Sequence, residues 1–158
     1  MRSTLTRFGP LLGLVAVSGA FAAAAIATPP VGQHPSVPVL GTFAGRQHVD
    51  TDGIKFKTRR PTDVASFTVT YDPGGYSGWH THPGMIIAVV QTGAVVREVG
   101  CRSRIYKAGE AFIESDEQPS GQVRNASATD PAVVVATQIV PQGSPRRVDQ
   151  DAAPTCHH

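Results

Sequence analysis

A series of short apolar and β-branched segments, separated by turn residues, constrains the fold of this chain more than any other feature. In the clearest segment, residues 65–71, apolar side chains alternate with serine and threonine at the period of a half-buried strand. Glycine, proline, aspartate and asparagine separate further candidate strands at residues 54–58, 85–91, 94–99, 104–107, 111–114, 122–125 and 132–140. Since no long amphipathic pattern accompanies them, the sequence predicts an all-β fold, an antiparallel sandwich or barrel.

Two of these segments, residues 85–90 and 133–135, are almost continuously apolar. A strand that is buried on both faces has this composition, whereas a strand with one solvated face alternates between apolar and polar residues. We therefore expect both of these strands to be buried on both faces.

The ends of the chain differ in composition from this central part. Residues 1–27 begin with two arginines and continue with an apolar stretch that ends in small residues, the layout of a secretory signal peptide. An uncleaved stretch of this length could span a membrane, but its glycines and proline favour cleavage. We therefore predict an exported protein, secreted or in the cell envelope, without stable membrane insertion after cleavage.

Domain boundaries follow from the same composition. Residues 28–38 contain four prolines and little apolar content, which is typical of an extended linker. Residues 39–140 contain nearly all the apolar segments and are predicted to form one folded domain. Residues 141–158 are rich in proline and charge, and are predicted to be a poorly packed C-terminal tail.

The charge balance excludes two classes of partner. The chain carries 14 basic and 12 acidic residues, and the predicted leader contains two arginines and no acid, so 12 of each remain after cleavage. Recognition of nucleic acids or anionic membranes requires a basic stripe or patch. We therefore expect a small-molecule ligand or substrate and no nucleic-acid partner.

The chain has two cysteines, Cys101 and Cys156. An exported protein meets an oxidising compartment, where a disulfide between them is chemically allowed. Closing a loop of this length would contribute about 4 kcal/mol on the chain-entropy estimate. The alternative is that the two thiols have no structural relation.

The strongest candidate for chemistry is the pair His80 and His82, which follows the glycine-rich segment 74–78. Side chains two residues apart on an extended strand point to the same side, so the two imidazoles converge in the manner of a metal site. Pro83 supports this arrangement because it favours an extended conformation for His82. A solvated or hydrogen-bonded histidine pair is the alternative for this motif.

Two segments of the chain resemble the cupin family. The order Gly74, five residues, His80-Thr81-His82, Pro83-Gly84 and Gly93 is similar to the first cupin motif. Residues 106–114, followed by Arg124-Asn125, resemble the second motif, and the resemblance covers most of residues 60–140. It implies the cupin jelly-roll barrel, an antiparallel double-stranded β-helix. The predicted leader makes the outline similar to small exported actinobacterial cupins.

A cupin metal site, as the resemblance implies it, has three histidines and one glutamate on facing strands. His80 and His82 occupy two of these positions, whereas Ile86 stands at the glutamate position and Gly121 at the third histidine position. The motif is therefore partly degenerate. Two imidazoles alone bind a divalent ion far less firmly than four protein ligands do.

Other residues could complete the site. Gln122 offers an amide oxygen beside Gly121, and His48 could fold over the mouth of the barrel. Glu98 and Glu114 also lie on candidate strands, but alternation alone does not decide which face they occupy. We take His80, His82 and Gln122 as the candidate ligands of a divalent transition metal, either Fe, Mn, Zn or Ni.

A ligand pocket is expected inside the barrel, since such cavities are mainly apolar with a few polar groups. The candidate lining residues are Phe67, Trp79, Met85, Ile87 and Phe112. One hypothesis is a metal-dependent small-molecule dioxygenase or isomerase, and the alternative is a non-catalytic ligand-binding module that has lost the metal site. A homodimer formed by sheet packing is compatible with both. No acid, base or nucleophile is singled out for a catalytic role.

Overall fold

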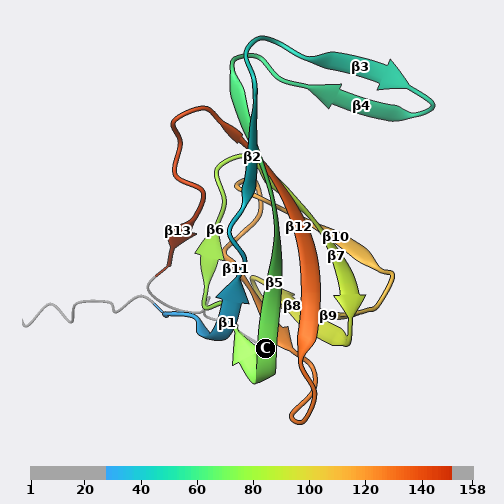
Figure 1. Cartoon of the computed structure of the whole chain (residues 1–158), viewed down its shortest axis with the longest axis vertical. Coiled ribbons are helices and arrows are strands. Elements are labelled where there is room, and N and C mark those ends of the chain that lie inside the picture. The colour runs from blue at the N-terminus through green and yellow to red at the C-terminus, as the bar shows by residue number, and fades with distance from the viewer. Residues whose placement is uncertain (1–27, 151–158) are drawn as a thin grey trace, which may run out of the picture.

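The computed structural model describes residues 28–150, and in this range the chain forms strands and loops without a helix (Figure 1). The described range therefore holds no helix of the length and apolarity needed to cross a membrane. The strands are β1 (Val31–Pro35), β2 (Val39–Phe43), β3 (His48–Thr51), β4 (Ile54–Lys57), β5 (Thr62–Tyr76), β6 (His80–Thr81), β7 (Met85–Thr92), β8 (Ala94–Val99), β9 (Arg102–Lys107), β10 (Ala111–Ser115), β11 (Gly121–Asn125), β12 (Ala132–Pro141) and β13 (Val148–Asp149).

The 15-residue strand β5 organises the barrel because it pairs with strands from both ends of the chain. One side of the sheet runs β10-β7-β12-β5, and β11 then connects β5 to β6 and β8. All pairings are antiparallel, including those of β1 and β2 with β5 and of β9 with β8. The fold is a nearly closed antiparallel double-stranded β-helix, which confirms the predicted fold class.

Alternation along the strands places one set of side chains inside the barrel. On β7, Ile86, Ala88 and Val90 are buried and belong to the same hydrophobic cluster as Val134 and Ala136 of β12. The cluster also contains Val95 of β8 and Val123 of β11, strands that do not pair with β7 or β12, so its burial joins both parts of the sheet.

The outer face of the same strands is exposed, which corrects the expectation of burial on both faces. Ile87 and Val89 of β7 are each 40% exposed, and Val135 of β12 is 38% exposed. These residues stand between the inward-facing ones, as the two-residue period of a strand requires. In this barrel, a strand with a continuous apolar run therefore still has one exposed face.

The segments expected as linker and tail contain strands of the barrel. Residues 28–38 include β1, which pairs with β5 from Val31↔Tyr76 to Pro35↔Val69. In the C-terminal segment, β13 pairs with β6 through Val148↔Thr81. Residues 1–27 and 151–158 lie outside the described residues, so the leader and the disulfide partner Cys156 stay predictions.

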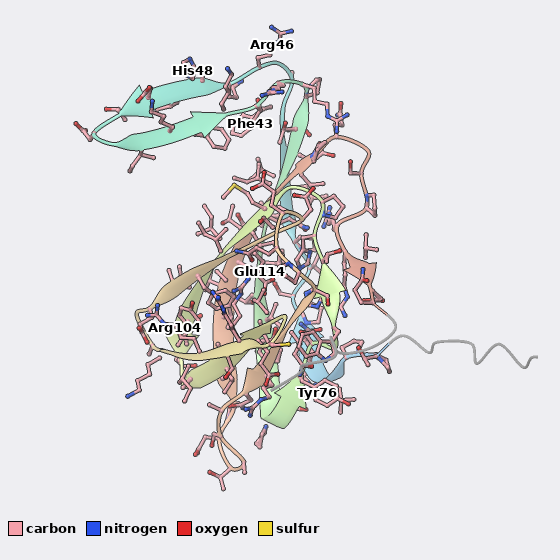
Figure 2. The ribbon with its side chains drawn as sticks, turned by 180° about the vertical axis from the view of Figure 1, so that it is seen from behind. Phe43, Arg46, His48, Tyr76, Arg104 and Glu114 are labelled. Carbon is pink, nitrogen blue, oxygen red and sulfur yellow. The ribbon has the colours of Figure 1, made fainter. Side chains whose placement is uncertain are left out.

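One element extends away from the barrel. Strands β3 and β4 form a separate two-stranded sheet, joined to β2 and β5 at its base (Figure 1). The rings of Phe43 and Phe56 meet at this base with centroids 6.0 Å apart. His48 lies on this hairpin and is exposed, far from Glu114 in the barrel (Figure 2).

Candidate metal centre

The turn before β6 fixes the first histidine. The backbone N–H of Ser77 donates to Val123 O (2.8 Å), and Ser77 Oγ accepts from Val123 N–H (2.9 Å), so the turn is tied to β11. Gly78 then directs its carbonyl oxygen at His80 Nδ1, 2.8 Å away. A carbonyl oxygen can only accept a hydrogen bond, so Nδ1 of His80 carries the proton. The other ring nitrogen, Nε2, faces Glu114 in the barrel interior.

The second histidine is held in the same way by the C-terminal segment. Nδ1 of His82 lies 2.6 Å from the carbonyl oxygen of Arg146 and therefore donates to it. The side-chain amide of Gln138, only 2% exposed, donates to the same carbonyl oxygen. Histidines that bind metals commonly have Nδ1 bonded to a carbonyl oxygen in this manner, which leaves Nε2 for the ion.

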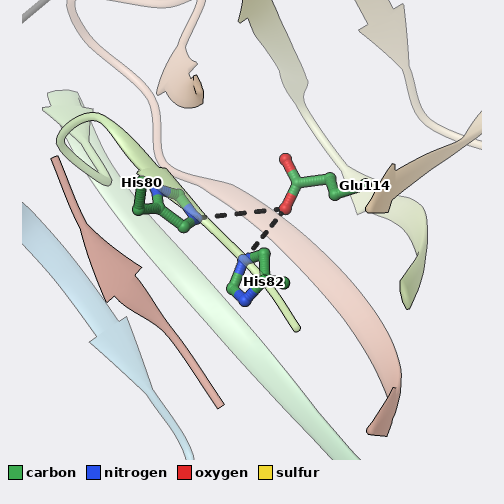
Figure 3. Close-up of side chains that lie close together, drawn as sticks. All are labelled: His80, His82 and Glu114. Atoms are coloured by element: carbon green, nitrogen blue, oxygen red, sulfur yellow. Dashed lines mark ion pairs between the residues drawn. The ribbon is translucent and has the colours of Figure 1, made fainter. Parts of the chain in front are cut away.

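Glu114 of β10 completes the cluster. Its Oε2 lies 3.3 Å from Nε2 of His82 and 4.0 Å from Nε2 of His80, and the three side chains point toward one another (Figure 3). The two imidazole rings are nearly perpendicular, with centroids 4.6 Å apart. In the strand pairing of β10 with β7, Glu114 lies directly opposite Ile86. The carboxylate absent from position 86 is therefore supplied by its cross-strand neighbour.

Burial and neighbouring charges keep His80 and Glu114 in forms that suit a metal ion. Burial lowers the pKa of His80 to about 4, so this imidazole is neutral near pH 7. For Glu114, burial alone would raise the pKa, but the neighbouring His82, His80 and Arg97 side chains outweigh it and lower the pKa. Glu114 is therefore a carboxylate at neutral pH.

The donor set fits a divalent transition metal. The ligand atoms of His80, His82 and Glu114 lie within 4.8 Å of one another. Ligand atoms bound to one ion at about 2.1 Å lie roughly 3–4 Å apart, close to the spacing found here. Two imidazoles and one carboxylate with open positions form the facial set that is typical of non-haem iron oxygenases.

A cavity of about 320 Å³ adjoins this cluster. Its walls are mainly apolar and include Phe67, Ile86, Phe112 and Val134. The hydroxyl of Tyr71 also faces it and accepts a hydrogen bond from Gln33 of β1 (3.0 Å). Burial raises the pKa of Tyr71 above its ordinary value, so the phenol keeps its proton as a donor.

Only some of the residues expected to line the pocket do so. Phe67 and Phe112 line the cavity, whereas Met85 and Ile87 belong to the outward-facing set of β7, and Ile86 lines the cavity instead. Trp79 is 9% exposed, but it packs in the turn before β6 and is not among the lining residues.

The residues expected to complete the metal site lie elsewhere. Gln122 donates from its amide to Glu98 Oε2 (2.6 Å) and lines neither cavity next to the histidines. Gly121 lies opposite His80 and offers no side chain. Sequence reasoning left the face of Glu114 open, and it gave no sign of Gln138 or of the Arg146 carbonyl. The pairing of residues 111–114 with 85–91 would have shown that Glu114 faces the interior.

The cupin domain family matches residues 67–137 of the chain. Among solved structures, the chain is similar to an uncharacterised conserved protein with a double-stranded β-helix domain from Klebsiella pneumoniae, at 19% identity and a TM-score of 0.48 over 56% of this chain and 76% of that one. It is also similar to a cupin-like protein from Thermotoga maritima, at 23% identity and a TM-score of 0.47 over 56% of this chain and 65% of that one. A third similar structure is a recombinant oxalate oxidase in complex with glycolate, at 19% identity and a TM-score of 0.48. The similarity covers 87% of this chain and 62% of that one.

The chain thus spans less than two thirds of the length of the last two structures. A comparison with curated proteins finds no match. The family match includes His80, His82 and Glu114, the residues that form the candidate metal centre. Residues 67–137 of the chain are therefore similar to the cupin domain family.

Proposed function

We propose that this chain is an exported single-domain cupin that binds a divalent transition metal through His80, His82 and Glu114. In this proposal it acts as a small-molecule dioxygenase on a compound held in the adjoining cavity. The observation that carries the proposal is the position of Glu114 Oε2 between the Nε2 atoms of the two histidines. Iron is the metal that best suits two imidazoles and one carboxylate with open positions, and Mn, Zn and Ni are the competing ions.

Each part of the site has a role in this proposal. The bound metal would supply a Lewis acid that orients and polarises the substrate. The carbonyl oxygens of Gly78 and Arg146 hold the two imidazoles in the tautomer that presents Nε2. The apolar walls exclude bulk water from the substrate, and the Tyr71 hydroxyl offers it a neutral hydrogen-bond donor.

A non-catalytic binding module is the second candidate, because the apolar cavity of about 320 Å³ would serve it equally well. Such a module needs no carboxylate beside two imidazoles. Metal dependence of ligand binding therefore separates the two candidates.

Export, the disulfide and dimerisation complete the proposal. Export rests on the composition of residues 1–27, and an oxidising destination would allow Cys101 and Cys156 to pair. The outer sheet face, with Ile87, Val89 and Ile113 each at least 40% exposed, is the surface on which two copies would pack. Light scattering at micromolar concentration that shows only monomer would contradict the dimer.

Metal analysis of tag-free protein tests the central proposal. His157 and His158 are replaced by alanine in every variant, because two terminal histidines could bind stray ions. In buffer that contains a small carboxylate, we expect one transition-metal ion per chain, lost on His80→Ala or His82→Ala and retained in the exposed control His48→Ala. Oxygen consumption across a panel of small organic substrates then tests the reaction. Metal-free protein that binds small ligands with unchanged affinity in the variants would leave the binding module as the function.

A further inference from the structure

Glu114 has a second partner, Arg97, which reduces the negative charge that the site offers a cation. Its Oε1 lies 3.5 Å from Nε of Arg97, and the two side chains are only 14% and 12% exposed. Nη2 of Arg97 donates to Gln118 Oε1 (2.5 Å), and the guanidinium lies 5.6 Å from the ring centroid of Phe112. Arg97 is therefore held beside the carboxylate, and its permanent charge offsets the charge of Glu114.

The other charged residues that line the cavity are two arginines, Arg146 and Arg147. Arg147 lines the cavity, donates to the carbonyl oxygen of Ser77 (2.6 Å) and pairs with Asp149 of β13. The carboxylate of Glu114 is matched by one guanidinium, and the guanidinium of Arg147 by one carboxylate. The charged side chains around the site thus supply no net negative charge to a divalent ion.

We infer that a divalent metal binds firmly here only together with an anionic ligand, and that the cavity takes small carboxylates with an apolar body. This inference rests on the proposed function. A doubly charged ion in a mainly apolar enclosure is unfavourable unless opposite charge accompanies it. A ligand carboxylate supplies that charge at the open positions of the metal, while its apolar body contacts Phe67, Ile86 and Phe112.

Cooperativity follows from this arrangement. Each partner raises the affinity of the other, and the two effects are equal because binding free energies are linked. A neutral ligand of the same shape fills the cavity but brings no charge, so it leaves the metal affinity unchanged. Charge and shape are therefore separable in a direct test.

Titration of chelator-treated, tag-free protein with Mn²⁺ by calorimetry provides that test, with the terminal histidines replaced as above. Benzoate serves as the anionic probe and benzamide as its neutral counterpart of nearly the same shape. We expect benzoate to lower the Kd for Mn²⁺ by about tenfold or more, and benzamide to change it by less than about twofold. Equal Mn²⁺ affinity with and without benzoate would overturn the inference.

A second measurement assigns the effect to Arg97. In Arg97→Gln the charge of Glu114 is no longer offset, so we expect Mn²⁺ alone to bind about tenfold more tightly and the benzoate effect to shrink below about threefold. Arg97→Lys keeps the charge and should keep the benzoate effect. Arg104→Gln is the matched control, since Arg104 pairs with Glu110 at 3.3 Å on the exposed surface. Weaker Mn²⁺ binding in folded Arg97→Gln protein would contradict the role of Arg97.

The two proposals fail in different ways. If Mn²⁺ binds neither with nor without benzoate, the metal centre itself is refuted. If Mn²⁺ binds equally in all conditions, the metal centre stands and the anion requirement alone is refuted. The wild-type comparison of benzoate with benzamide decides this even if the Arg97 variants do not fold.

Discussion

The barrel interior and the β3–β4 hairpin are both built by antiparallel pairing, and both carry histidine, but they place it in opposite environments. His80 and His82 are 6% and 8% exposed, and a carboxylate from another strand lies beside them. His48 on the hairpin is exposed, and it is not a member of the metal-ligand cluster of the described residues. A two-stranded sheet has no opposite wall, so convergence of ligands requires the curved sheet of the barrel.

The largest expected difference between the two regions concerns stability. Phe112 is 6% exposed and contacts Tyr106, with ring centroids 4.9 Å apart, whereas Phe56 is only partly buried at the base of the hairpin. We expect Phe112→Ala to lower the free energy of unfolding by about 3–5 kcal/mol, and Phe56→Ala by about 1 kcal/mol. Urea unfolding measures both. Equal losses would show that the hairpin is part of the cooperative core.

Metal affinity is expected to distinguish the regions almost as strongly. Glu114→Gln removes the ligand charge while keeping the shape, and should raise the Kd for Mn²⁺ by about 100-fold, or about 2.7 kcal/mol. Asp50→Asn is the hairpin control, since Asp50 pairs with exposed Lys55, at 3.2 Å. Calorimetric titration in the presence of benzoate checks both variants. Unchanged affinity in Glu114→Gln would remove Glu114 from the ligand set.

Acidification should weaken the barrel through its interior histidine. The pKa of His80 is about 4 in the folded chain, while a histidine in the unfolded chain has its ordinary pKa of 6.5. The unfolded state therefore binds more protons as the pH falls from 6.5 to 4, and the free energy of unfolding of metal-free protein falls over this window. The lowered pKa of Glu114 acts in the same direction at the acidic end.

Urea unfolding across this pH range checks the effect. His80→Asn should show a smaller loss of stability on acidification, while His48→Asn should behave like the wild type. A wild-type stability that rises toward pH 4 would contradict the burial of a neutral His80.

The smallest expected effect is that of the hairpin on the site. Residues 46–59 are exposed along most of their length, and none of them lines the cavity beside the histidines. Replacing them by a short glycine-serine connection should change the Kd for Mn²⁺ by less than about threefold. A larger loss would mean that the hairpin takes part in the site.

Most strands of the barrel were predictable because their side chains alternate or form apolar runs bounded by turn residues, but β2 was not among the predicted segments. Each of the eight predicted segments corresponds to a strand, with ends that differ by a few residues. The strands β1 and β13 were not expected, because residues 28–38 and 141–150 are poor in apolar side chains. They join the barrel through backbone pairing with β5 and β6, which leaves little trace in the sequence.

The site was predictable only in part. The spacing of His80 and His82 predicts on its own that both imidazoles point to the same side of an extended segment. Because β7 is apolar along most of its length, its sequence does not show which residues face the interior. Ile87 was expected to face the cavity, but Ile86 does so instead. The role of Glu114 depends on the register between β10 and β7, a long-range property that the local pattern of either strand does not contain.

Anomalous diffraction from a crystal grown with Mn²⁺ and benzoate would locate the metal ion itself. We expect one metal peak within about 2.4 Å of Nε2 of His80, Nε2 of His82 and a carboxylate oxygen of Glu114, with the benzoate carboxylate at an open position. A cavity without a metal peak, or an ion bound away from Glu114 while that carboxylate stays on Arg97, would contradict the proposed metal centre.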